Sequence, residues 1–190
     1  MNHLPIEAVA HLFYGGPNRA EEVEGDRLRL ITPADFELKL LSEPKFVRRS
    51  NHEDLEQVQL GDILVALSGP IGATITATQE HEGAVLGHWC AGVRLIASDH
   101  PVNAEWLRAW VESSGFRSQV KKWTSGDNFL RLPEPALRSF SVPVPTEEDL
   151  ERLEVLNTSV AKALQSLSEV SREIHRLRSI EMNLLFCEAS

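Results

Sequence analysis

The fold is decided by one stretch near the C-terminal end, residues 146–186: TEEDLERLEVLNTSVAKALQSLSEVSREIHRLRSIEMNLLF. Its apolar residues recur at alternating steps of three and four, and Glu181 takes one apolar position of the pattern. This spacing is a heptad repeat and predicts the contact face of a coiled-coil helix. The repeat positions are Leu153, Leu156, Val160, Ala163, Leu167, Val170, Ile174, Leu177 and Leu184.

The sequence also marks where this helix begins. Pro145 precedes it, Thr146 is a favourable N-cap, and carboxylates follow in the first turn. About 40 residues at ~1.5 Å each make a rod of roughly 60 Å, whereas a globule of about 140 residues has a radius of gyration near 14 Å. We therefore expect residues 146–190 to form a spacer or dimerisation helix whose distal part needs another helix. The alternative is a helix that lies on its own domain for its first half and frays beyond it.

The first 145 residues predict an α+β domain. Residues 63–67 are an apolar run of strand length, and residues 71–78 alternate Ile and Thr with small residues, so we expect a β-hairpin here. This order of elements favours one domain over residues 1–145, with a twisted mixed β-sheet core and short helices. Further strands are expected at 28–31, 83–86, 90–96 and 137–144, and helices at about 106–111 and 116–123.

Composition limits the class of protein. The chain has 190 residues, 42% of them hydrophobic, which is enough for one core and an appendage. No long apolar segment or signal pattern is present, so we expect a cytoplasmic protein without membrane contact. Cys90 and Cys187 lack zinc-type spacing and are expected to be reduced thiols. The net charge of −9 argues against non-specific coating of nucleic acid, but it leaves room for a local basic face.

A search for catalytic or cofactor motifs finds none. The turn at residues 69–72 lacks the spacing and the Lys of a phosphate-binding loop, and no serine-nucleophile motif is present. We therefore expect no catalytic residue, metal site or cofactor in this chain. The possible metal ligands are interpreted as ordinary core or rim residues, because they lack helical spacing; they are His81, His88, Cys90, Asp99 and His100.

Two short basic clusters interrupt the acidic background, around Arg48 and around Lys121. Hydroxyl and amide side chains accompany the cations, a combination that binds phosphates and base edges. We expect the cations at 48, 49, 121 and 122 to lie on one face. Composition alone favours the other interpretation, two solvated loops beside a packed Trp. The candidate DNA-binding residues are Arg48, Arg49, Ser50, Asn51, Arg117, Lys121, Lys122, Ser125 and Asn128.

The order of motifs resembles a known family. Residues 61–72, GDILVALSGPIG, resemble the "GDIL…SG.IG" signature of target recognition domains in type I restriction-modification specificity subunits. The segments 9–12, 30–35, 106–113 and 137–145 are similar to further family motifs, so the likeness covers nearly the whole chain. The start of the long helix departs from the family pattern, with EDLER at 148–152. Members commonly carry two recognition domains and two long helices, and this chain has one of each.

The resemblance implies a role in sequence-specific recognition of double-stranded DNA. In the family the helices pack antiparallel and set the distance between recognition domains. Adenine methyltransferase subunits, which use S-adenosylmethionine, grip around them, and a translocase or restriction subunit can join. The specificity subunit itself is not an enzyme.

Our leading hypothesis is a half-length specificity subunit of a type I-like restriction-modification or phage-defence system. It would pair through its helix with a second copy and read a split, symmetric site. The pairing residues would be Leu153, Leu156, Val160, Leu167, Val170, Ile174, Leu177 and Leu184. The alternative is the same fold used as a protein-protein adaptor in a defence complex, without DNA binding; an enzyme comes third.

Overall fold

The computed structural model describes residues 2–17, 24–37, 44–49, 54–124 and 131–187, with side chains up to Met182 in the last helix. The chain divides into two compact units, Met1–Pro145 and Thr146–Ser190. The first unit combines strands with short helices, and the second is the long helix α4 (Glu147–Cys187). The predicted α+β class is confirmed.

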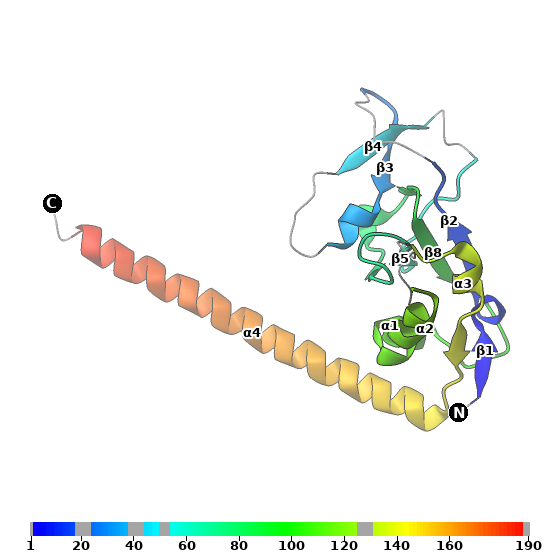
Figure 1. Cartoon of the computed structure of the whole chain (residues 1–190). Helices are drawn as coiled ribbons and strands as arrows, with labels where there is room; N and C mark the ends of the chain where they lie inside the picture. Colours follow the sequence, from blue (N-terminus) through cyan, green and yellow to red (C-terminus); the bar gives the residue numbers. More distant parts are fainter. Residues whose placement is uncertain (1, 18–23, 38–43, 50–53, 125–130, 188–190) are drawn as a thin grey trace. The chain divides into compact units, whose positions relative to one another are not determined.

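An antiparallel sheet forms the centre of the first unit (Figure 1). Its strands β5 (Ile63–Ala66) and β6 (Thr74–Thr76) form the hairpin predicted for residues 63–78, with Leu64 opposite Ile75. Side chains of β5 alternate between two apolar cores, because Ile63 and Val65 point into one and Leu64 into the other. In order across the sheet, the strands are β2 (Ala10–Tyr14), β8 (Cys90–Leu95), β5 (Ile63–Ala66) and β6 (Thr74–Thr76).

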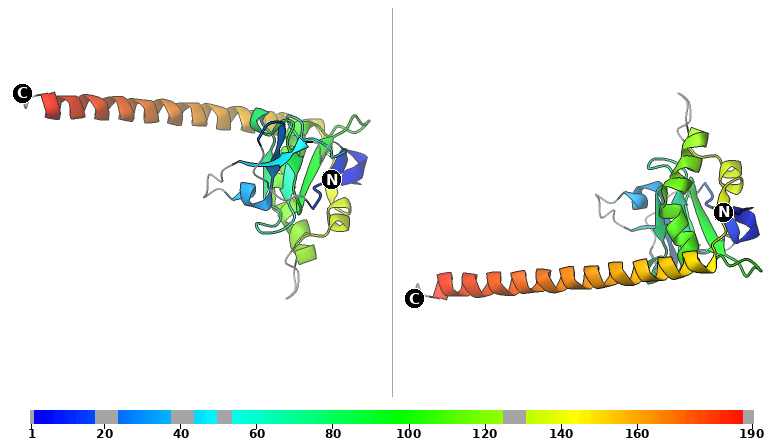
Figure 2. Two further views of the ribbon diagram at one scale, coloured as in Figure 1. Left: turned by 90° about the horizontal axis from the view of Figure 1, so that it is seen from above. Right: turned by 90° about the horizontal axis from the view of Figure 1, so that it is seen from below.

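Short helices and a two-stranded ribbon cover one face of this sheet (Figure 2). The largest core lies between them, where the rings of Phe116, Trp110 and Phe140 meet edge to face. Phe116 and Trp110 come from two helices predicted from their amphipathic spacing, which are confirmed. The covering elements are α1 (Ala104–Glu112), α2 (Ser114–Thr124), α3 (Glu134–Arg138), η1 (Ile6–Ala8) and the antiparallel pair β1 (His3–Pro5) and β9 (Ser141–Pro143).

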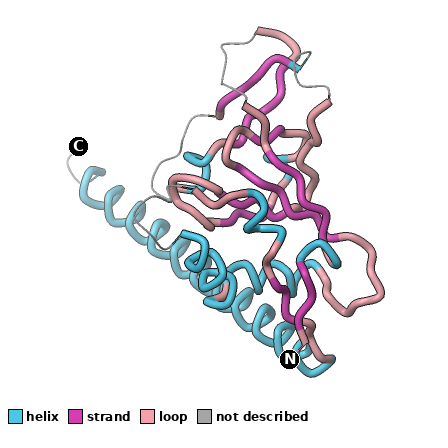
Figure 3. Tube along the Cα trace, turned by 45° about the vertical axis from the view of Figure 1, so that its right-hand side comes forward, coloured by secondary structure: helices cyan, strands magenta, loops and turns pink. Residues whose placement is uncertain are grey.

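A second, mixed sheet adjoins the other face. It consists of β4 (Lys45–Arg48), β3 (Arg27–Ile31) and β7 (Val85–Leu86), with β3 antiparallel to β4 and parallel to β7. The short helices η2 (Pro33–Phe36) and η4 (Gln79–His81) lie on the connections that follow β3 and β6. The described residues thus form three small sheets, and only this one of them is mixed. In Figure 3 strands and loops make up most of the first unit.

One predicted strand is wrong in its first half. Residues 137–144 were expected to be extended, but Leu137 belongs to helix α3 and the strand is limited to Ser141–Pro143. Pro135 lies in the first turn of α3, where its fixed φ angle favours a helix and its missing N–H costs nothing. The periodicity of so short a segment did not reveal this turn.

The predicted N-cap of α4 is confirmed. The hydroxyl of Thr146 accepts a hydrogen bond from the backbone N–H of Asp149 at 3.2 Å. The Asp149 carboxylate in turn accepts from the backbone N–H of Thr146 at 3.0 Å and from its hydroxyl at 2.8 Å. This reciprocal capping box satisfies backbone donors that a helix leaves free at its start.

Candidate nucleic-acid interface

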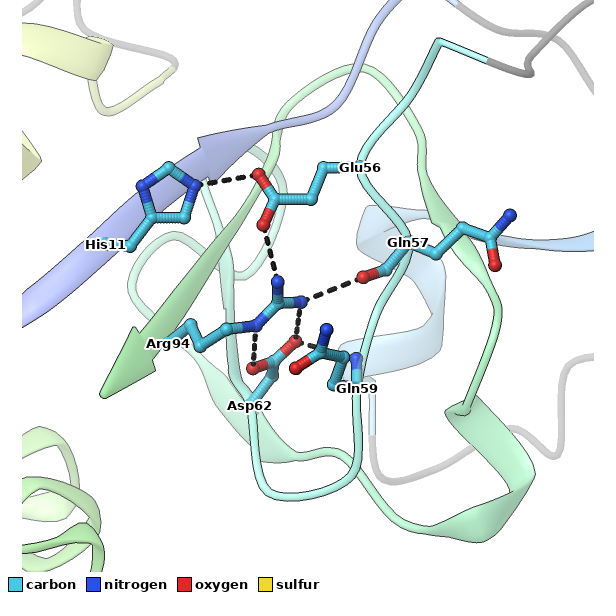
Figure 4. Close-up of polar contacts among 6 residues, drawn as sticks. All are labelled: His11, Glu56, Gln57, Gln59, Asp62 and Arg94. Atoms are coloured by element: carbon cyan, nitrogen blue, oxygen red, sulfur yellow. Dashed lines mark hydrogen bonds and ion pairs between the residues drawn. The ribbon is translucent and has the colours of Figure 1, made fainter. Parts of the chain in front are cut away.

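A buried ion pair anchors the segment that leads into β5 (Figure 4). The Asp62 carboxylate is almost fully buried and receives two hydrogen bonds from Arg94 on β8, from Nε at 2.9 Å and from Nη2 at 2.7 Å. The same carboxylate accepts the backbone N–H of Gln59 at 2.8 Å. Such a bidentate pair is stronger and more directional than a single contact. The hydrogen bond from Arg94 to Asp62 is also the main reason that the pKa of Arg94 is raised.

The network continues to the surface. Arg94 Nη1 donates to Glu56 at 2.5 Å, and Nη2 donates to the backbone carbonyl of Gln57 at 2.8 Å. The second oxygen of Glu56 lies 2.7 Å from Nε2 of His11, which is opposite Arg94 on β2. These contacts tie residues 56–62 to the central sheet, so their role is to position a loop. The sequence singled out Asp62 only as part of a motif, and nothing in it pointed to Arg94.

The outer face of the mixed sheet is unusually basic for an acidic protein. Strand β3 alternates Arg and Leu, and its register with β4 puts Arg27 opposite Arg48 and Arg29 opposite Phe46. Side chains in a strand alternate between faces. The Leu residues of β3 and Val47 are buried beneath the sheet, so the arginines lie on the opposite side. We call the set Arg27, Arg29, Phe46 and Arg48 the arginine face.

The cations of the arginine face differ in their contacts. The Arg27 guanidinium lies 4.0 Å from the centre of the Phe46 ring. Arg29 Nη1 donates to the backbone carbonyl of Glu80 at 3.0 Å, while its Nε is buried without a hydrogen-bond partner. Among the described residues, neither Arg27 nor Arg48 forms an ion pair with a carboxylate. Like charges placed opposite each other repel, so this end of the face would be stabilised by a bound anion.

The basic residues that neighbour the arginine face have partners or environments of their own. Arg49, a predicted DNA-binding residue, forms an ion pair with Asp26 at 2.8 Å. Lys45 points to the other side of the sheet and donates to the Thr32 hydroxyl at 3.1 Å. His81 borders the face, and burial followed by the nearby Arg29 charge lowers its pKa. Arg48 was among the residues predicted from sequence, but Arg27 and Arg29 were not, although the Arg-Leu-Arg-Leu alternation at 27–30 indicated their shared face.

The second predicted cluster lies on helix α2. Phe116 and Val120 face the core, and Arg117, Lys121 and Lys122 are exposed. Two lysines in the last turn also interact favourably with the helix dipole, so their placement has a structural explanation as well. Arg117 lines a cleft of about 570 Å³ together with carboxylates, Asp35 and Glu112.

Four predicted contact residues lie outside the described part of the chain: Ser50, Asn51, Ser125 and Asn128. The described cations come from separate elements, strand β4 near the top and helix α2 in the lower half of the first unit in Figure 1. That Arg48, Arg49, Lys121 and Lys122 share one face stays a prediction.

Helix α4 exposes a long apolar stripe. Of the predicted repeat positions, Leu167 is 65% and Ile174 59% exposed, and Leu153 is partly buried. The side chain of Leu184 lies outside the described part of the helix. Ile180, exposed beside Glu181, continues the apolar stripe where the repeat is interrupted. The other exposed repeat positions are Leu156, Val160, Ala163, Val170 and Leu177.

Other kinds of site find little support in the described residues. No group of three His, Cys, Asp or Glu side chains in them could hold a metal ion. Burial raises the pKa of the Cys90 thiol to about 12, so this thiol is protonated at neutral pH and is a poor nucleophile. None of the described helices has the length and apolar character needed to cross a membrane.

Comparison with known proteins places the fold. No family model matches the sequence, but solved structures resemble it. The HsdS subunit from Thermoanaerobacter tengcongensis gives a TM-score of 0.61 at 18% identity, over 89% of this chain and 39% of that chain. The type I restriction-modification S subunit from M. genitalium gives a TM-score of 0.62 at 12% identity, over 97% of this chain and 46% of that chain. This chain has the fold of a type I S subunit.

A further match supports the type I S-subunit fold. It comes from a structure that addresses complex assembly and conformational transition of the type I R-M system. That chain gives a TM-score of 0.58 at 21% identity, over 93% of this chain and 43% of its own length. The chain thus spans less than half the length of each of these solved chains.

The motif that carried the family resemblance has structural roles in this S-subunit fold. Gly61 has a φ of 87°, which favours glycine, and it places Asp62 for its pairing with Arg94. Gly72 has a φ of 75°, and a Cβ there would lie 2.9 Å from the Val120 side chain of α2. The motif therefore builds the β5–β6 hairpin and its contact with α2.

Proposed function

We propose that this protein is a DNA specificity subunit of a type I-like restriction-modification or related phage-defence system. The arginine face carries the proposal, because it sets Arg27 directly opposite Arg48 on an exposed sheet surface. Neither guanidinium has a carboxylate partner among the described residues, so both are available to phosphate oxygens. The S-subunit fold supports the same conclusion.

The net charge of −9 is compatible with this role. At physiological salt the Debye length is about 8 Å, so distant carboxylates are largely screened from a bound phosphate. Local cations determine contact with the DNA backbone, and base-edge contacts determine sequence preference. A small basic face on an acidic protein favours specific binding over coating, since little general attraction accompanies it.

The chemistry of the system would belong to partner proteins. DNA adenine methyltransferase subunits using S-adenosylmethionine would modify the site, and a translocase or restriction subunit could join them in the cytoplasm. This chain would supply recognition and assembly, without catalysis or a cofactor of its own.

Helix α4 would supply the assembly surface, through pairing with a second copy of the chain. Its charge distribution favours an antiparallel pair. The first turns are acidic, because only Arg152 balances the carboxylates Glu147, Glu148, Asp149, Glu151 and Glu154. Residues 162–178 are basic, because two carboxylates, Glu169 and Glu173, face four cations, Lys162, Arg172, Arg176 and Arg178. Antiparallel pairing brings the acidic end of one helix beside the basic end of the other, and parallel pairing would oppose like charges.

The DNA proposal is tested by salt-dependent binding of the full chain to mixed-sequence duplex DNA. Each phosphate contact removed should lower the slope of log K against log salt by about 0.9. We expect Arg27→Gln and Arg48→Gln each to weaken binding and to lower the slope by this amount. The control is Arg152→Gln, which removes an exposed arginine paired with Glu148 on α4 and should change neither quantity. A double variant, Arg27→Gln with Arg48→Gln, that kept wild-type affinity and slope would overturn this assignment.

A further inference from the structure

The turn between β7 and β8 holds an aromatic residue in an unfavourable backbone conformation. Trp89 has a φ of 69° and is the only residue other than glycine with positive φ in the described part of the chain. Bulky side chains avoid this region, and such conformations persist only where the surroundings enforce them. Residues held in this way often have a functional task.

Three strands hold the turn in place. The backbone N–H of Gly87 donates to the carbonyl of Ile31, at the end of β3, at 2.7 Å. The carbonyl of Trp89 accepts the backbone N–H of Leu67, just after β5, at 2.7 Å. Gly15, after β2, approaches so closely that a Cβ there would lie 1.9 Å from the Gly87 carbonyl oxygen. The turn is therefore a rigid junction between the two larger sheets.

Trp89 forms a platform for two exposed side chains. Its own ring is partly buried against the main core. The guanidinium of Arg131 lies over that ring, 4.4 Å from its centre, and the imidazole of His88 meets it edge-on at 3.9 Å. An arginine stacked on an aromatic ring keeps its planar fork of N–H donors in a defined orientation.

The backbone at Arg131 is equally well fixed. Arg131 forms an isolated antiparallel bridge with Ser68, and the N–H of the fully buried Leu132 donates to the carbonyl of Leu67 at 2.7 Å. No carboxylate among the described residues forms an ion pair with Arg131. A stacked, pre-oriented and unpaired guanidinium thus projects from a rigid part of the domain.

We propose that Arg131 reads a guanine in the recognised DNA, with Trp89 as its positioning residue. This inference rests on the proposed function. Two parallel N–H groups of arginine match O6 and N7 of guanine in the major groove. A fixed orientation matters most for reading a base edge, because contacts to base edges carry sequence information, whereas contacts to phosphates only position the protein on the duplex. The arginine face, by contrast, groups several cations as phosphate contacts require.

The experiment is a selection of binding sites from random duplex DNA by the full wild-type chain and by Arg131→Ala and Arg131→Lys variants. We expect the wild-type site to contain a fixed guanine and both variants to lose the preference at that base pair alone. Affinity for the wild-type site should fall about 5- to 150-fold. Trp89→Leu should weaken the same preference without changing the salt slope. Arg108→Ala, an exposed arginine on α1, is the matched control and should select the wild-type site.

The outcomes separate the two proposals. If the wild-type chain selects a site and Arg131→Ala selects the same one with an equal guanine preference, the inference fails and the proposed function stands. A uniform loss of affinity over all sequences, with a salt slope lower by about 0.9, would make Arg131 a phosphate contact and also overturn it. If the wild-type chain binds no DNA, both proposals fall. If Arg131→Ala does not fold, the Arg131→Lys variant tests the proposal, because lysine keeps the positive charge but lacks the planar pair of N–H donors.

Discussion

At the scale of single residues, a few polar side chains determine the local geometry of the first unit. The Asp62 carboxylate is 2% exposed and its partner Arg94 20%. Removing one member of a buried ion pair leaves the other charge without compensation, which is more costly than never having the pair. The backbone of Trp89 also depends on its neighbours, because its positive φ persists only while hydrogen bonds from neighbouring strands hold the turn.

We predict that Asp62→Asn destabilises the first unit by about 3 kcal/mol, near the lower end for a buried pair because Arg94 keeps its pair with Glu56 and some contact with water. Urea unfolding followed by Trp fluorescence measures this effect, since all four Trp residues belong to the first unit. Glu173→Gln is the control, because its pair with Arg176 on α4 is exposed on both sides; it should leave the transition unchanged. A stability equal to wild type for Asp62→Asn would show that the ion pair does not hold the loop.

At the scale of elements, local signals in the sequence were enough for the hairpin, for α1 and α2, and for the start of α4. They failed at α3, a helical turn with Pro135 near its start that extends to Arg138, into a segment (137–144) expected to be a strand. The beginning of α4 depends on a capping box between Thr146 and Asp149. Hydrogen bonds from the backbone and side chain of Thr146 keep the pKa of Asp149 below its ordinary value.

We predict that Thr146→Ala costs about 1 kcal/mol in the first turn of α4, seen as faster amide exchange there by NMR. In wild type the pKa of Asp149 is lowered, so the stability that its carboxylate gives the helix start is fully present above the unfolded-state pKa, about 3.9. The contribution is lost as pH falls through the lower folded-state value. Protection of the first turn should therefore be constant from neutral pH to about pH 4 and decrease below it. Thr158→Ala, an exposed mid-helix threonine, should not change the first turn; equal protection in Thr146→Ala would argue against the cap.

At the scale of the whole molecule, the chain combines a mixed α+β unit with a helix whose apolar stripe is exposed along most of its length. An exposed apolar stripe of this size marks an interaction surface. The acidic-to-basic change along α4 is the basis of the proposed antiparallel pairing of two helices.

We predict that the wild-type chain sediments as a dimer at tens of micromolar and that Leu167→Glu weakens the dimer at least about 100-fold. Each of the two Leu side chains would lose about 1.5–3 kcal/mol of burial. Thr158→Glu places the same charge off the apolar stripe and should leave the dimer intact.

Salt distinguishes the orientations of the pair. An antiparallel dimer should weaken as moderate salt screens its opposite charges, whereas a parallel dimer should tighten as repulsion is screened. A monomeric wild-type chain at these concentrations would exclude self-pairing.

The sequence alone determined the elements whose signals are local: the heptad repeat of α4, its cap, the alternation of the β5–β6 hairpin and the two amphipathic helices. Periodicity reports which side of an element is apolar, so these follow from residue order. Tertiary structure decided which distant residues meet. Arg27 faces Arg48 through strand register, Arg94 reaches Asp62 across the sheet, and Arg131 stacks on Trp89 because separate strands fix both. Such contacts depend on the path of the chain in space, which no local pattern records.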